Sequence, residues 1–162
     1  MNVADVLKYG NLTLLDTLKN VPKSTWETPG VCGVWSVKDI VAHLSSYELM
    51  LAETQSAFLD GGPTPIRDTF SRLGGKANDH LVEARQALSI DEILGEYEAA
   101  HAKVMSQIVQ IPEETRRQNG TIPWYGEDYD LEDLITYMNY AHKREHCAEI
   151  NVFRDQLEQT KS

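Results

Sequence analysis

Two histidines, His142 and His146, are the residues of this chain whose type and spacing best suit chemistry. In an α-helix, side chains four residues apart lie one turn above the other on the same face, so both imidazoles can reach one point in space. Imidazole is a common ligand of divalent metals, and residues 131–157 show a helical pattern of apolar positions. The pair therefore has the spacing of metal ligands on a helix.

Two histidines bind a divalent metal incompletely. A catalytic metal usually takes three protein ligands and leaves one position open for water or substrate. By α-helical periodicity, Ile135, Met138, Glu149 and Phe153 share the face of the pair, which predicts that the imidazoles point toward an apolar interior. His43, beside the apolar stripe of another predicted helix, is the candidate for the third ligand.

Each histidine also has a plainer interpretation. A pair such as His142 and His146 can be two core residues hydrogen-bonded to backbone or carboxylates, and a lone histidine such as His43 can be a satisfied core residue. His101 lies on a predicted inward face, where it can be a fourth ligand or a proton carrier, although a packed histidine is the favoured interpretation. His80 falls in a poorly patterned segment and is expected to be solvated.

Carboxylates near such a site have two roles open to them. A ligand imidazole usually donates its second N–H to a carboxylate or carbonyl, which fixes the tautomer. Glu149, Asp39 and Glu48 are candidates for this role by position. Glu149 is also the candidate catalytic residue, as a general base. The sequence does not decide between these two roles of Glu149.

The first half of the chain contains two predicted helices. The first covers residues 3–21, with Asn2 as N-cap and Pro22 as a stop, and Gly10 on its buried face suggests a close helix contact. Residues 22–35 form a loop. The second helix begins after Ser36, which forms a capping box with Asp39, and extends to about residue 60.

The second half contains two more bundle helices. A crossover at 64–76 and a helix at 77–88 lead to a capping box at Ser89, a helix that ends at Pro112, a loop, and the last helix, capped by Asp130. No segment shows the alternation of a strand. The predicted class is all-α, an antiparallel four-helix bundle with long crossover connections, forming one domain over residues 1–162.

Composition excludes several functional classes. The net charge is −10 and no basic cluster exceeds the pair Arg116 and Arg117, so nucleic acid is not expected as a partner. No apolar run approaches the length of a membrane span, and the first residues do not resemble a signal peptide, so we expect no membrane contact and a cytoplasmic location. Cys32 and Cys147 lack the spacing of a metal finger or a redox motif, which fits a reducing compartment.

The segment Trp35–Leu44, with the pattern W-S-x-x-D-x-x-x-H, together with the H-x3-H pair and the layout of almost the whole chain, resembles the DinB/YfiT-like superfamily of small metalloenzymes. The resemblance implies a four-helix bundle in which His43, His142 and His146 hold a divalent metal, often zinc or nickel. It also implies, from some members, a transferase or isomerase that uses a low-molecular-weight thiol such as mycothiol, bacillithiol or glutathione.

Two functional classes follow. The first is an enzyme whose three-histidine metal site activates a thiol, water or carbonyl group of a small-molecule substrate, as in a transferase, an isomerase or a hydrolase. The second is a non-catalytic, stress-linked helical protein, a homodimer whose site is vestigial or binds metal for stability. Metal content of untagged protein separates the two only in part, because occupancy does not name a substrate.

Overall fold

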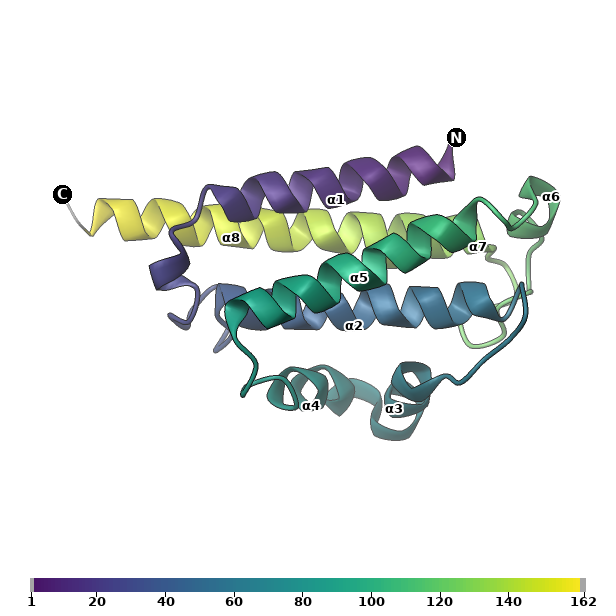
Figure 1. Cartoon of the computed structure of the whole chain (residues 1–162), viewed down its shortest axis with the longest axis horizontal. Helices are drawn as coiled ribbons and strands as arrows, with labels where there is room; N and C mark the ends of the chain where they lie inside the picture. Colours follow the sequence, from purple (N-terminus) through teal and green to yellow (C-terminus); the bar gives the residue numbers. More distant parts are fainter. Residues whose placement is uncertain (1, 161–162) are drawn as a thin grey trace.

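The computed structural model describes residues 2–160, and in this part of the chain helices form every regular element (Figure 1). Four long helices make the bundle: α1 (Val3–Lys19), α2 (Val37–Ser56), α5 (Ile90–Ile108) and α8 (His142–Gln159). Extended pairing among the described residues is limited to an isolated bridge between Cys32 and Trp35. The prediction of an all-α bundle is confirmed.

Side-chain caps begin the helices where the sequence predicted. The Asn2 side chain accepts the backbone N–H groups of Ala4 and Asp5 at the start of α1. Capping boxes begin α2, α5 and the short helix α7 (Leu131–Leu134), formed by Ser36 with Asp39, Ser89 with Glu92, and Asp130 with Asp133. Each box satisfies donors that the first helical turn leaves free, which fixes the first residue of each helix.

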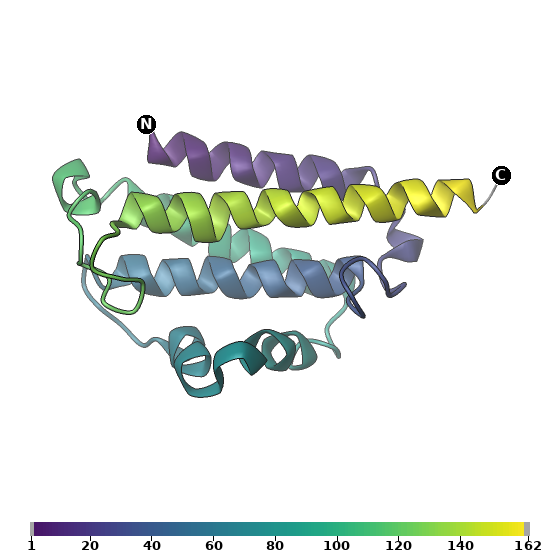
Figure 2. The same cartoon turned by 180° about the vertical axis from the view of Figure 1, so that it is seen from behind.

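The direction of the helices explains the long crossover. Figures 1 and 2 show α1 antiparallel to α2, whereas α2 and α5 run in the same direction, so the chain must return along the bundle between them. The return path contains α3 (Pro65–Leu73), η2 (Gly74–Lys76) and α4 (Ala77–Glu83). A loop with the short helix α6 (Glu113–Arg116) then leads to the last helix, while η1 (Lys23–Thr25) lies between α1 and α2.

Two predicted boundaries are wrong. The second helix ends at Ser56 rather than near residue 60, because the next residues form turns before Gly61. The helix predicted over residues 77–88 ends at Glu83.

The last helix differs from its prediction in a way that matters for the site. It is α-helical over Leu131–Leu134, π-helical over Ile135–Ala141 (η3), and α-helical again from His142. A π-helix bonds residue i to i+5, so the α-helical period does not hold across it. The α-helical period by which Ile135 and Met138 were placed on the face of His142 therefore does not apply here. Ile135 is fully buried, while Met138 is half-buried and lines a cavity together with His142.

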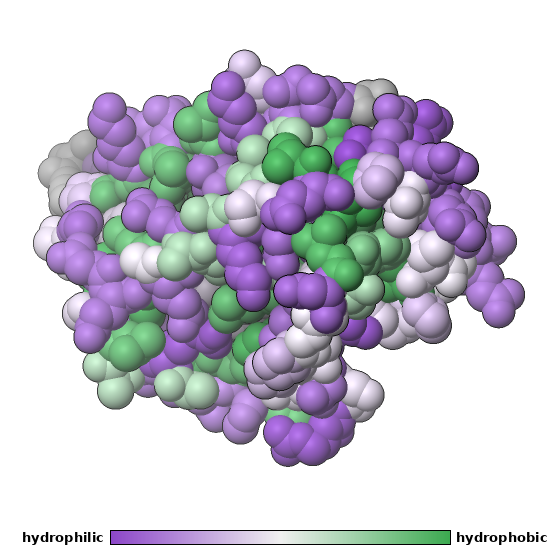
Figure 3. Space-filling model, turned by 45° about the vertical axis from the view of Figure 1, so that its right-hand side comes forward, coloured by the Kyte–Doolittle hydropathy of each residue, from purple (hydrophilic) through white to green (hydrophobic). Residues whose placement is uncertain are grey.

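The core is divided into two apolar clusters along the bundle. One contains Leu14, Val41 and Ile150 and the other contains Leu7, Leu51, Val104 and Leu134. Along the helices, buried polar residues occupy the positions between the two clusters: Glu48 on α2, His101 on α5, and Asn139 and Lys143 on the last helix. The face shown in Figure 3 is mainly hydrophilic with apolar patches. No described helix is long and apolar enough to cross a membrane.

Candidate metal centre

Three histidines from two helices meet in the bundle. His142 Nε2 lies 3.0 Å from His43 Nε2 and 3.0 Å from His146 Nε2. His43 and His146 are buried and His142 is half-buried. Within residues 2–160, a group of three or more histidine, cysteine or carboxylate side chains close enough to hold a metal ion occurs here. The structure thus brings together the three histidines that the sequence singled out.

Local structure accounts for this convergence. Ser36 and Asp39 fix the start of α2, and His43 follows on its buried face. His142 and His146 lie in the first two turns of α8, where regular α-helix resumes after η3, so they are one turn apart. Aromatic rings flank the histidines. The ring centroid of Trp35 lies 4.8 Å from that of His43, and the ring centroid of Tyr47 lies 4.3 Å from that of His142.

The surroundings keep two of the three imidazoles neutral. Burial, followed by the neighbouring histidines, lowers the pKa of His43 to about 3. Burial and the proximity of His146 lower the pKa of His142 to about 4. Imidazole must be deprotonated to donate a lone pair to a metal ion. At neutral pH both rings are therefore in the form that binds a metal.

The outer ring nitrogens differ in their partners. His146 Nδ1 lies 2.7 Å from Glu149 Oε2, the contact expected of a ligand histidine. The Nδ1 atom of His43 is buried and has no hydrogen-bond partner among the described residues. The chemistry of the three convergent nitrogens fits a divalent ion such as zinc or nickel.

Asp39 does not support the three rings. Its carboxylate accepts the backbone N–H of Ser36 at 2.9 Å and the side-chain amide of Gln86 at 2.7 Å. It therefore stabilises the start of α2 rather than a histidine of the cluster.

A buried polar network lies next to the histidines, and the sequence analysis missed it. Glu48 accepts hydrogen bonds from the Lys143 ammonium and from Asn139 Nδ2 at 2.9 Å, and its second oxygen lies 3.1 Å from His101 Nδ1. Burial acts to raise the pKa of Glu48, but Lys143 and His101 outweigh it and hold that pKa well below its usual range. Glu48 and His101 therefore belong to this network rather than to the histidine cluster.

A sequence signal for the network did exist. Asn139 and Lys143 are four residues apart, as are His142 and His146, and Lys143 Nζ donates to Asn139 Oδ1 at 2.8 Å. Lys143 is almost fully buried, although it is a lysine directly beside a candidate ligand.

Two cavities lie on either side of Tyr47, whose ring packs against His142. The larger, of about 390 Å³, is lined by Tyr47, Met50, Arg67, Phe70, Trp124 and Met138, among others. The smaller, of about 280 Å³, includes His142 and Glu145 in its lining and shares Tyr47 and Met138 with the larger one. One histidine of the cluster thus borders a space that a small molecule could enter.

Comparison with known proteins gives one match. A family model described as the DinB superfamily matches residues 12–150, a range that contains all three histidines. Searches of curated proteins and of solved structures each found no match.

Proposed function

The chain belongs to the DinB superfamily, and we propose that it is a metal-dependent enzyme in which His43, His142 and His146 hold a divalent ion, zinc or nickel. The observation that carries the proposal is the convergence of three Nε2 atoms, with His142 at 3.0 Å from each of the other two. Four protein ligands usually close a structural zinc site, whereas catalytic sites use three. A three-histidine set next to a cavity favours catalysis over a purely structural metal.

The residues around the cluster would each have a defined part. A divalent metal in such a site supplies Lewis-acid activation of a water, thiol or carbonyl group. Glu149 would hold His146 with its proton on Nδ1, which leaves Nε2 free to donate its lone pair. Glu149, predicted as the catalytic carboxylate, is thus proposed as a positioning residue that acts through His146.

Glu145 is the carboxylate that shares a cavity with His142. It is exposed, one turn before Glu149 on the same helix. We propose that Glu145 accepts or returns a proton at the substrate, because a general base must lie within reach of the proton that it moves.

The reaction class that we propose is a transferase or isomerase step on a small molecule, with a low-molecular-weight thiol as co-substrate. The test uses untagged protein substituted with cobalt and titrated with glutathione and with 2-mercaptoethanol. Thiolate ligation should add an intense charge-transfer band. Absence of a new band with either thiol would reject the thiol-dependent version and leave a hydrolase as the alternative.

One control concerns the chain's own thiol. Cys32 forms a backbone bridge with Trp35, whose ring lies 4.8 Å from that of His43, between centroids. Burial and the Glu149 carboxylate raise the pKa of the Cys32 thiol. The titration is therefore repeated with Cys32→Ser. A band that appears only on addition of thiol, and survives this substitution, comes from the added thiol.

A further inference from the structure

The larger cavity contains an arginine whose binding capacity the protein does not use. Arg67 lines this cavity together with aromatic and thioether side chains from α2, α3 and the loop before α7. A volume of about 390 Å³ lies within the range of small-molecule sites. The cavity is therefore large enough for a compact organic ligand.

The backbone of Arg67 is held firmly in place. Glu53, buried on α2, accepts the backbone N–H of Ile66 at 3.0 Å and that of Arg67 at 2.9 Å. The Arg67 guanidinium lies over the ring of Trp124, 5.6 Å from its centroid. The side chain thus crosses from α3 to the loop that carries Trp124.

The guanidinium itself lacks a polar partner within residues 2–160. Arg67 Nε is buried and makes no hydrogen bond, and the described side chains and backbone make none to the two terminal nitrogens. Buried donors in folded proteins are almost always paired, so an unpaired one calls for an explanation. A ligand that accepts hydrogen bonds from the guanidinium is such an explanation.

No carboxylate among the described residues forms an ion pair with this guanidinium, although Glu53 and Asp68 lie nearby. The oxygens of Glu53 accept backbone N–H groups, and Asp68, which also borders the cavity, accepts the Thr64 hydroxyl at 3.0 Å. Within residues 2–160, neither carboxylate forms an ion pair with Arg67. An anion would gain a partner there that the protein leaves unused.

The rest of the lining defines the ligand further. Phe70, Met50 and Trp124 offer apolar and aromatic surface. Tyr47 connects the two cavities, since its ring lies 5.6 Å from Phe70 and 4.3 Å from His142. A molecule with a carboxylate on Arg67 and an apolar body against these rings would extend toward the smaller cavity and His142.

We propose that the cavity beside Arg67 binds the carboxylate of a small organic acid with an apolar or aromatic body, in a fork of charge-assisted hydrogen bonds. That the bound acid then reacts at the histidines rests on the proposed function. Binding of the anion itself does not require the metal, so the two ideas can be tested apart.

The test measures binding of phenylacetate and of its neutral counterpart phenylacetamide to the full chain by NMR, in zinc-loaded and metal-free protein. The reporters are the Arg67 Nε–H and Trp124 indole N–H signals. Phenylacetate should shift both signals saturably, and phenylacetamide should bind at least about tenfold more weakly because it lacks the charge. Equal affinity for the two probes, or no saturable shift with phenylacetate, would overturn the proposal.

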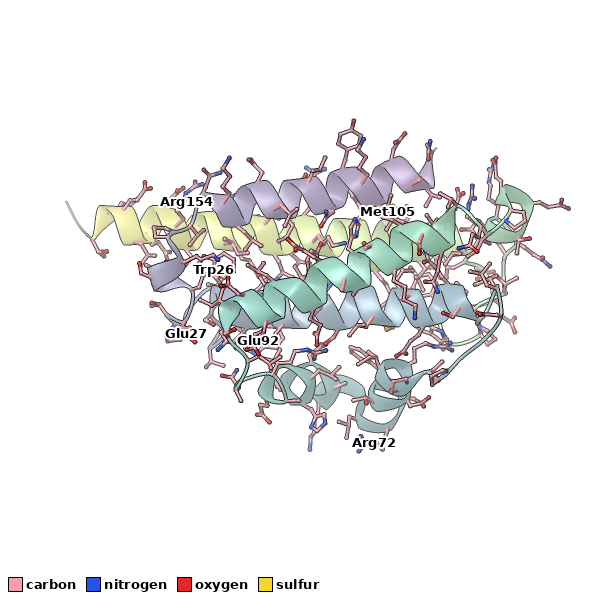
Figure 4. All side chains as sticks on the ribbon, viewed as in Figure 1. Trp26, Glu27, Arg72, Glu92, Met105 and Arg154 are labelled. Atoms are coloured by element: carbon pink, nitrogen blue, oxygen red, sulfur yellow. The ribbon has the colours of Figure 1, made fainter. Side chains whose placement is uncertain are left out.

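A matched pair of variants completes the test. Arg67→Met should raise the Kd for phenylacetate at least about tenfold. Arg72→Met removes the same charge from α3 on its outer side, away from the bundle (Figure 4), and should change the Kd less than about twofold because of screening. Should Arg67→Met fail to fold, Arg67→Lys keeps the charge without the fork and should still bind measurably more weakly. Equal Kd values for the Arg67 and Arg72 variants would overturn the proposal.

Zinc content of the same samples separates the two ideas. Phenylacetate binding at Arg67 in a protein that takes up no zinc would leave the anion site standing and remove the proposed function. Zinc bound in full, with no response of Arg67 to phenylacetate, would overturn the anion site alone.

Discussion

Lys143 and Glu48 form an ion pair in the centre of the bundle, where 1% of the lysine and 0% of the glutamate remain exposed. Asn139 and His101 bind the same carboxylate, so its charge is shared by three partners. Removing one member of a buried pair leaves the other charge without compensation, which costs far more than the pair itself contributes.

Lys143→Met should therefore lower the free energy of unfolding by about 3 to 5 kcal/mol. Urea denaturation followed by circular dichroism measures this. The double variant Glu48→Leu with Lys143→Met should recover part of the loss, because it removes both charges.

The control is an exposed pair, Lys23 with Asp91, whose side chains are 61% and 83% exposed. Lys23→Met should change stability by less than about 1 kcal/mol. A loss for Lys143→Met no greater than that for Lys23→Met would show that the buried pair is not important for stability.

Gly10 marks a close approach of α1 to the last helix. A Cβ at this position would lie 2.9 Å from Cδ2 of Tyr140, nearer than real contacts allow. Gly10→Ala should therefore destabilise the protein by roughly 1 to 2 kcal/mol, since the clash outweighs the better helix propensity of alanine. Thermal unfolding measures the change.

Gly95 offers the matched control. It lies inside α5, is exposed, and has no atom near enough to meet a new Cβ. Gly95→Ala should stabilise the protein by about 0.5 to 1 kcal/mol. If both substitutions raised the melting temperature, the close packing of α1 on η3 would be wrong.

Much of the bundle could be predicted because its signals are local. Ser36 and Ser89 form the capping boxes that the sequence indicated, and Asp130, predicted as a cap, forms a third. The suspected close contact at Gly10 is confirmed by Tyr140. The grouping of His142 with His146 follows from helix geometry. His43 was predicted from its place beside an apolar stripe and from the resemblance to a family, because no local rule brings together two residues 99 positions apart.

The parts that were missed depend on tertiary structure. Periodicity does not indicate a π-helix at 135–141, and a hydrophobic count does not reveal that Lys143 is buried with Glu48. Arg67 lies in a crossover of mixed composition, and its cavity exists only where α3 meets the loop of Trp124. A single domain, a homodimer and a cytoplasmic location stay predictions.

Glu149 should matter through His146. Glu149→Gln keeps the size of the side chain but weakens the contact with His146 Nδ1, so zinc affinity should fall by about 10- to 100-fold while the fold is kept. Competition with a chromogenic chelator measures the affinity. Glu145→Gln, one turn away, is the control and should retain the native zinc affinity; an equal loss in both variants would point to charge alone.

The metal-free protein should lose stability in mild acid. In the unfolded chain His43 and His142 take up protons near pH 6.5, whereas the folded chain holds their pKa values at about 3 and about 4. The unfolded state therefore binds more protons between these values, and stability falls as the pH falls from 7 toward 4. The contribution of the two rings between pH 7 and pH 5 should be on the order of 4 kcal/mol, about 2 kcal/mol for each.

Urea unfolding at several pH values measures this dependence. The variant His43→Gln with His142→Gln should show a shallower loss over the same range, because the two groups no longer titrate. An unchanged slope in that variant would assign the acid sensitivity to other groups.

The most direct test is elemental analysis of untagged protein after exposure to zinc and removal of the excess. If the three histidines form a metal site, the native protein should retain roughly one equivalent of metal per chain. The exposed His80→Ala control should match it, and His142→Ala should lose most of the metal while it keeps its helical circular dichroism. A native protein that retains no metal, or a His142→Ala variant that retains as much as the native protein, would contradict the three-histidine site.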